Sequence, residues 1–165
     1  MSTSTIPTIT DRLTGAFTAL ITPLRDGEID LPALRELVDF QIEGGIDGLV
    51  PCGTPGESAT MTEREHALVM EPVMEQAAGR VRVIAGPGTN NTRLTIERTR
   101  HARDAGATAA LLVVPYYNKP TQEGLIAHYT AIAEATDLPL VLYNVPGRTG
   151  ITMSPQPTIT LSRIP

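Results

Sequence analysis

The chain has 165 residues, a formal net charge of −5, 41% hydrophobic residues and 19% charged residues. This length and apolar content suit one globular domain, since a chain of about 150 residues buries roughly 68–70% of its unfolded surface. The acidic balance argues against nucleic acid and anionic membranes as partners, because both require a basic face.

Residues 1–13 are expected to form a flexible tail, because their start is rich in Ser and Thr. This start also lacks the basic and apolar stretches of a signal peptide. Five short apolar runs follow, mostly without polar alternation, as is typical of strands covered on both faces. These predicted strands are Ala16–Ile21, Gly48–Val50, Val81–Ala85, Ala109–Val114 and Leu138–Tyr143. The longest run is far shorter than the ~20 residues of a membrane helix.

Helical patterns fill most of the gaps between these runs. Helices are predicted to begin near Asp30, Thr62, Thr92 and Thr121, and the first should end at the Gly44-Gly45 pair. A weaker helical signal starts at Ser154, where Pro157 is expected to interrupt it.

The alternation of strand and helix predicts an α/β fold with a parallel sheet and right-handed crossovers. Two architectures fit this pattern: an open doubly wound sheet, or part of a (β/α)8 barrel, which needs ~250 residues when complete. The pattern alone does not choose between them. In both, ligands bind at the carboxyl ends of the strands, so the residues after each strand are the candidate site.

The turn after the second strand contains Gly53 and Gly56, which let the backbone approach a ligand, with the hydroxyl of Thr54 between them. A tight turn explains the glycines equally well, and the lysine of a phosphate-binding loop is missing. The turn after the third strand resembles a dinucleotide fingerprint. It is a poor match, because Asn91 replaces the third glycine and Pro87 removes an amide.

Thr54, Tyr117, Tyr143 and Arg148 all follow strands and should therefore face one rim. Any one of them could be a packing or solvated surface residue, but a hydroxyl, two phenols and a guanidinium together suit a small carboxylated oxo-acid and proton transfer. No nucleophile-base set, carboxylate pair or metal-ligand spacing stands out, so we expect no metal and no cofactor. The single cysteine, Cys52, excludes a disulfide within the chain, and a cytoplasmic location is expected by default.

The strings at Pro115–Pro120 and Tyr143–Gly150, with Gly15–Pro23 and Gly53–Thr60, resemble the dihydrodipicolinate synthase family. This family belongs to the pyruvate-dependent Schiff-base aldolases, together with N-acetylneuraminate lyase. The resemblance implies a (β/α)8 (TIM) barrel that forms homo-oligomers. It also implies that residues 14–165 are a partial barrel of about five β-α units, cut before the sixth strand.

The resemblance implies a lyase that condenses pyruvate with aspartate semialdehyde on the way to lysine and diaminopimelate. Tyr143 would donate and accept protons, and Thr54 would connect it to Tyr117 from a dimer partner. Arg148 would hold the carboxylate of the semialdehyde. Gly53, Thr54 and Pro55 stand where pyruvate binds.

Three departures from the family pattern stand out. Pro55 offers neither the amide nor the hydroxyl of the usual threonine, so pyruvate binding should be weaker. In the lysine-effector pocket that the resemblance implies, Glu63 replaces a histidine and Leu94 a glutamate, so feedback inhibition is not expected. The other residues of that pocket are Ser58, Ala59, His66, Asn90 and Tyr116.

The third departure concerns the Schiff-base lysine, which is absent. The one lysine, Lys119, occupies a position that is not nucleophilic in the family, so the chain alone is expected to be inactive. Three alternatives stay open: another aldolase or lyase of the superfamily, a non-catalytic half-barrel that binds a partner, and an open-sheet nucleotide-binding domain.

Overall fold

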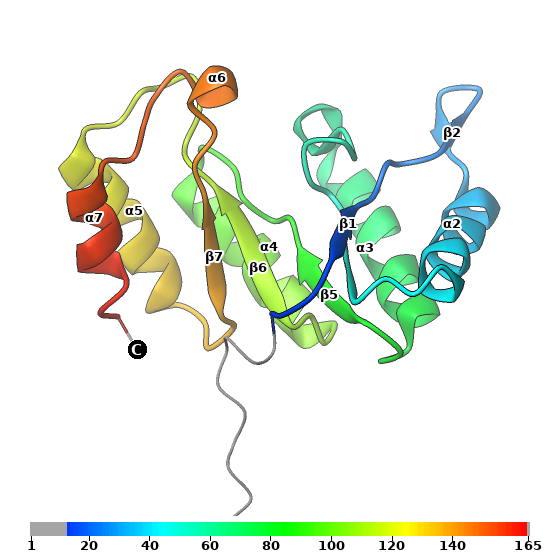
Figure 1. The fold of residues 1–165 in the computed structure, drawn as a ribbon. Coiled ribbons are helices and arrows are strands. Elements are labelled where there is room, and N and C mark those ends of the chain that lie inside the picture. The colour runs from blue at the N-terminus through cyan, green and yellow to red at the C-terminus, as the bar shows by residue number, and fades with distance from the viewer. Residues whose placement is uncertain (1–12, 165) are drawn as a thin grey trace, which may run out of the picture.

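The computed structural model describes residues 13–164 and contains a five-stranded parallel sheet (Figure 1). The strands lie in the order β1-β4-β5-β6-β7, so each one pairs with its neighbour along the chain of βα units. Their bounds are β1 (Phe17–Ala19), β4 (Gly48–Val50), β5 (Arg82–Ala85), β6 (Ala109–Val113) and β7 (Leu140–Tyr143). All five predicted strands are confirmed, four of them with shorter bounds.

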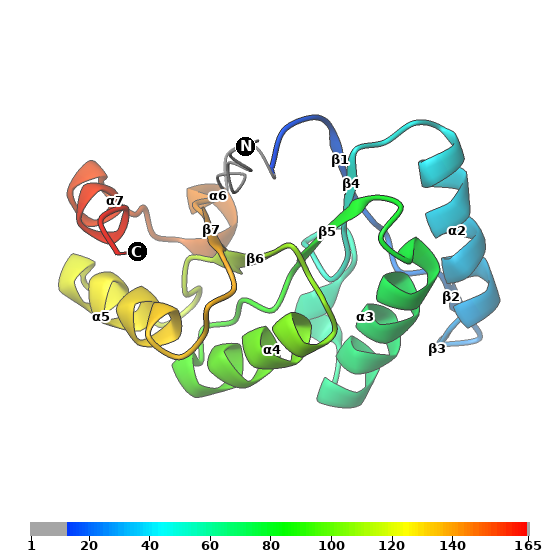
Figure 2. The same ribbon diagram turned by 90° about the horizontal axis from the view of Figure 1, so that it is seen from below.

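The helices that follow these strands lie along one face of the curved sheet (Figure 2). They are α2 (Leu31–Glu43), α3 (Glu63–Ala77), α4 (Thr92–Asp104) and α5 (Gln122–Ala133). Two further helices, α6 (Pro146–Thr149) and α7 (Pro155–Leu161), follow β7 in the chain. A doubly wound sheet has helices on both faces and reverses its strand order at a switch point. Sequential order with helices outside is the arrangement of a barrel, so the fold is a partial (β/α)8 barrel.

Alternate residues of each strand face opposite sides of the sheet. Leu49, Val83 and Leu112 belong to the main core between the sheet and the helices. On the other face, Val50, Ile84 and Ala109 form a second, smaller cluster. The same alternation places Tyr143, paired in register with Val113, on this inner face at the carboxyl end of the sheet.

The helix starts are capped as the sequence predicts. Asp30 Oδ1 accepts a hydrogen bond from the amide of Ala33 at 3.1 Å, and Thr62 and Glu65 form a reciprocal capping box at the start of α3. The prediction for Pro157 was wrong, because α7 continues through it. Pro157 lies in the first turn of α7, where an amide has no acceptor within the helix and its loss breaks no bond.

A short hairpin of β2 (Leu24–Arg25) and β3 (Glu28–Ile29) was missed by the sequence analysis. Its turn is formed by Asp26 and Gly27, with φ of +52° and +85°. An Asp-Gly pair in this left-handed conformation is typical of a two-residue hairpin turn, so the signal was present in the sequence.

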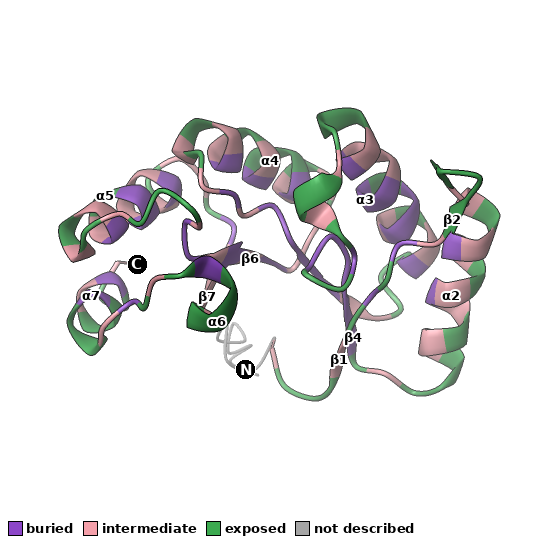
Figure 3. Cartoon of the chain, turned by 90° about the horizontal axis from the view of Figure 1, so that it is seen from above, coloured by how far each residue is buried: buried purple, intermediate pink, exposed green. Residues whose placement is uncertain are grey.

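Most of the predicted tail, residues 1–12, lies outside the described residues, whereas Leu13 packs against the cluster on the inner face. The burial map shows buried positions on the sides of α3, α4 and α5 that face the sheet (Figure 3). Within residues 13–164, no helix is long and apolar enough to cross a membrane.

His128 on α5 generates a prediction about stability. Its side chain is buried, and its Nε2 has no hydrogen-bond partner within residues 13–164. Burial lowers the pKa of His128 from 6.5 to about 4. Because the unfolded chain binds this proton at higher pH, the stability is complete above pH 6.5 and should fall as the pH drops towards 4. The loss should reach about 3 kcal/mol.

The free energy of unfolding measured against pH in wild type and His128→Leu checks this. In His128→Leu, the free energy of unfolding should change much less between pH 6.5 and 4 than it does in wild type. His101→Leu is the matched control, because the side chain of His101 is 45% exposed. If His128→Leu keeps the pH dependence of wild type, the loss of stability does not come from His128.

Candidate functional site

A cavity of about 520 Å³ opens at the carboxyl end of the sheet, lined by the loops that follow β4, β5, β6 and β7. Thr54, Tyr117, Tyr143 and Arg148 all line it, together with Gly53. The geometric expectation that these residues face one rim is therefore confirmed. Pro55 is exposed beside Thr54 but is not part of the lining.

The loop that carries Thr54 has an unusual backbone. Cys52 and Glu57 both have left-handed φ angles, +54° and +59°, which cost free energy for residues other than glycine. A hydrogen bond from the buried Thr22 hydroxyl to the carbonyl of Gly56, at 2.8 Å, ties this loop to the segment after β1. The amide of Gly56 in turn donates to the carbonyl of Gly53 at 3.1 Å.

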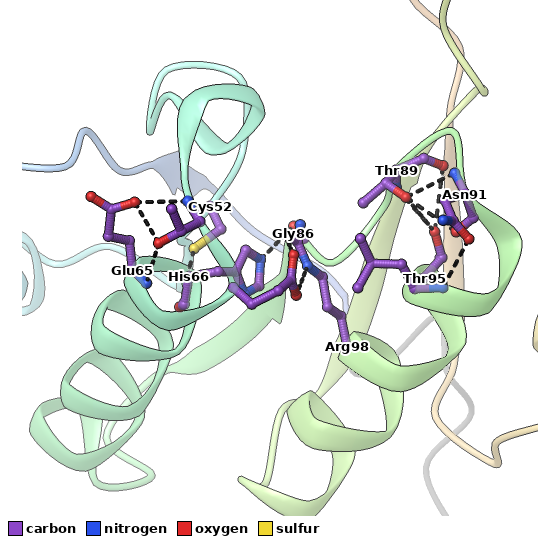
Figure 4. A network of polar contacts seen from close by, with 11 residues as sticks. Cys52, Glu65, His66, Gly86, Thr89, Asn91, Thr95 and Arg98 are labelled. Carbon is purple, nitrogen blue, oxygen red and sulfur yellow. Dashed lines mark hydrogen bonds and ion pairs between the residues drawn. The ribbon is translucent and has the colours of Figure 1, made fainter. Parts of the chain in front are cut away.

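His66 fastens the same loop to α3 and to the turn after β5 (Figure 4). The Cys52 thiol donates to the His66 carbonyl with a distance of 3.9 Å. His66 Nε2 lies 3.3 Å from the carbonyl of Gly86, which can only accept, so this nitrogen carries the proton. Burial lowers the pKa of His66, and the ring is only 4% exposed, so it is held neutral inside the protein.

Cys52 lines the cavity but is not suited to act as a nucleophile. Burial raises the pKa of its thiol to about 12, and the thiolate is the reactive form. Its place in the loop is better explained by its hydrogen bond to His66.

The two neighbouring tyrosines lie differently. Tyr117 is 89% exposed and has a left-handed φ of +71°, whereas Tyr116 is partly buried. Asn90 Nδ2 donates to the carbonyl of Tyr116 at 3.2 Å. Within residues 13–164, no hydrogen bond joins the hydroxyls of Thr54, Tyr117 and Tyr143, so a single chain does not close the expected relay.

The residues of the implied effector pocket are only partly assembled around the cavity. Ser58, Ala59 and Tyr116 line it, and Asn90 bonds to Tyr116. His66 does not line the cavity, and its Nε2 donates a hydrogen bond to the carbonyl of Gly86.

Sequence analysis missed Arg98 on α4, which also lines the cavity. Its guanidinium is 9% exposed and forms two bonds to Glu63, from Nε at 2.9 Å and from a terminal nitrogen at 2.5 Å. These hydrogen bonds hold the pKa of the Glu63 carboxyl below its usual range. No local pattern could have indicated a contact between residues 35 positions apart.

Two other cavities offer fewer polar side chains that are free to bind a ligand. One of about 520 Å³ lies near the amino ends of the strands. Its arginines are engaged, since Arg80 pairs with Asp39 and Arg82 donates to the carbonyl of Thr14. The other, of about 750 Å³, is a mainly apolar groove beside β7 and α7. In the described part of the chain, no group of three histidine, cysteine, aspartate or glutamate side chains could hold a metal ion.

Comparison with known proteins gives a consistent result. A model of the dihydrodipicolinate synthetase family matches residues 12–165. A 4-hydroxy-tetrahydrodipicolinate synthase of Nitratidesulfovibrio vulgaris (Miyazaki F) is 57% identical over 150 residues, covering 91% of this chain and 50% of the relative. The relative of the same name in Thermomicrobium roseum is 59% identical, covering 87% of this chain and 48% of its own length.

Solved structures agree with these matches. Dihydrodipicolinate synthase from Aquifex aeolicus superposes with a TM-score of 0.88 at 46% identity, covering 90% of this chain and 50% of that one. The Acinetobacter baumannii enzyme, complexed with pyruvate, superposes with a TM-score of 0.89 at 51% identity, covering 92% of this chain and 52% of that one. The chain thus spans about half the length of the relatives it matches.

The close approach of two loops at Gly86 makes a testable prediction. A Cβ at this position would lie 2.3 Å from the Cys52 carbonyl oxygen, so the backbone must move to admit Gly86→Ala. Such overpacking costs about 1–3 kcal/mol. Thermal unfolding should show this loss for Gly86→Ala. Gly147→Ala is the control, because a Cβ there meets nothing within 4 Å. Equal stability of the two variants would contradict the packing described.

Proposed function

Because the chain belongs to the dihydrodipicolinate synthetase family, we propose that it supplies the substrate-binding and proton-transfer residues of a 4-hydroxy-tetrahydrodipicolinate synthase. That lyase condenses pyruvate with aspartate semialdehyde in the biosynthesis of lysine and diaminopimelate. The observation that carries the proposal is the convergence of Thr54, Tyr117, Tyr143 and Arg148, from three separate stretches of chain, on one cavity.

In this proposal a primary amine condenses with the keto group of pyruvate, which releases water and forms an imine. Loss of a proton from the imine gives an enamine, whose carbon attacks the aldehyde. Tyr143 donates and accepts these protons, because it lies on the inner face where its hydroxyl can meet a bound keto acid. Thr54 orients it. We do not assign the amine to Lys119, which is exposed and does not line the cavity.

Arg148 receives the carboxylate of the semialdehyde. Its guanidinium has no ion pair with any residue of the described chain, and a planar guanidinium can hold a carboxylate through two hydrogen bonds. Arg98 is less suited to this role, since its charge is already balanced by Glu63. That pairing, with the uncharged Leu94, also supports the expectation that lysine is not a feedback inhibitor.

The exposure of Tyr117, at the rim of its own cavity, supports a homo-oligomer in which its phenol also reaches the site of a partner subunit. Residues 14–165 then form one partial-barrel domain of that assembly, and we place the reaction in the cytoplasm. A second candidate, another pyruvate-dependent aldolase, is favoured by Pro55 alone, because the change falls where pyruvate binds.

Replacement of Arg148 tests the substrate assignment. Arg148→Ala should lower kcat/KM for aspartate semialdehyde by at least about a hundredfold, because a charge-assisted pair to a carboxylate is lost. The measurement is steady-state kinetics of the intact protein with pyruvate and the semialdehyde. Arg163→Ala, an exposed arginine beyond α7, should leave the kinetics unchanged. Full activity in Arg148→Ala would refute this role, and preference for a different aldehyde would support the second candidate.

Pro55 provides a gain-of-function test. Pro55→Thr restores an amide and a hydroxyl beside Thr54, and a hydrogen bond to a charged group contributes roughly 1.5–3 kcal/mol. Pyruvate should therefore bind about tenfold or more tightly to the variant in calorimetric titration. Unchanged affinity would show that position 55 does not contact pyruvate in this protein.

A further inference from the structure

The segment that carries Arg148 cannot hold its own position. It runs from Asn144 to Ser154, between β7 and α7, and contains only α6, a helix of four residues. So short a helix is unstable in isolation, because the first turn fixes several residues for one hydrogen bond. Contacts outside α6 must therefore fix the backbone that presents Arg148.

The side chain of Asn144 provides two of these contacts. Its Nδ2 donates to the carbonyl of Met153, and its Oδ1 accepts from the amide of the same residue, both at 3.2 Å. Asn144 directly follows Tyr143, so this pair closes the segment on the end of β7. The packing of Met153, which is 7% exposed, anchors the far end of the segment in the main core.

Gln122 provides two more contacts from a different element. It is the first residue of α5, and its Nε2 donates to the carbonyl of Thr152 at 3.0 Å, while its Oε1 accepts from the amide of Ser154 at 2.9 Å. The two side chains thus bind three consecutive backbone residues. An amide side chain carries a donor and an acceptor on two separate atoms, and each of these pairings uses both.

The rest of the segment transmits this anchoring to Arg148. The Thr149 hydroxyl, 3% exposed, lies 2.9 Å from the carbonyl of Ile151 and 3.2 Å from that of Val145. Gly150, with φ of +71°, ends α6 and donates to the carbonyl of Pro146 at 2.9 Å. Figure 1 shows α6 above the end of β7, with α7 beside α5.

We propose that Gln122 and Asn144 are positioning residues that jointly hold the Arg148 segment at the rim of the cavity, and so set the affinity for the carboxylate of the second substrate. The part of this statement that concerns the substrate rests on the proposed function.

The test compares Gln122→Met with Gln76→Met, which removes an amide of the same length between α3 and α2, where Gln76 bonds to Asp39. Backbone hydrogen exchange is measured in the intact protein. Gln122→Met should speed exchange at Gly150, Met153 and Ser154 by about tenfold, since each side-chain hydrogen bond contributes on the order of one decade. Gln76→Met should not change exchange there. Equal exchange at these amides in the two variants would overturn the proposal.

Kinetics then separate positioning from general stability. Gln122→Met and Asn144→Asp, which loses the donor to Met153, should each raise KM for the semialdehyde about tenfold and leave KM for pyruvate unchanged. A parallel rise in both constants would show a merely structural role and overturn the positioning claim. If wild type binds neither pyruvate nor the semialdehyde, the proposed function fails, and the exchange result still decides whether the two amides hold the segment.

Discussion

The site depends on one constraint: parallel strands joined by crossovers bring all their carboxyl ends to the same edge of the sheet. The position of Tyr143 follows directly from this constraint. The residue ends β7, and the alternation of side chains along the strand places it on the inner face. The other candidate residues lie in loops, so their positions depend on side chains that hold those loops. Thr22 and His66 hold the loop of Thr54, and Gln122 and Asn144 hold that of Arg148.

Burial keeps the groups beneath the cavity neutral, while the charge available to a ligand lies at its rim. Cys52 and His66 are buried, and desolvation moves the pKa of each towards its neutral form. Arg98 keeps its charge but shares it with Glu63. Arg148 is exposed, and its guanidinium forms no ion pair within residues 13–164. This difference supports the proposal that the carboxylate of the semialdehyde binds at Arg148 rather than at Arg98.

The sequence allowed the architecture to be predicted because strand runs and helix caps are local signals. Thr62 and Glu65 form a capping box within four residues, and this local pattern predicts the start of α3. Pro157 led to a wrong prediction, because proline does not interrupt a helix when it lies in the first turn. The convergence of Thr54 and Arg148 could also be predicted, since both follow strands. The Arg98–Glu63 and Gln122–Ser154 contacts could not, because residues more than thirty positions apart meet only after the chain has folded.

The most direct test of the central claim is a nuclear magnetic resonance titration of the isotopically labelled protein with pyruvate. Amide shifts should be confined to the loops around Gly53, Tyr143 and Arg148 at the carboxyl end of the sheet. Shifts centred on Arg80 and Arg82, at the amino-end cavity, would contradict the account, as would shifts confined to the groove beside α7. No shift at any pyruvate concentration would also contradict it.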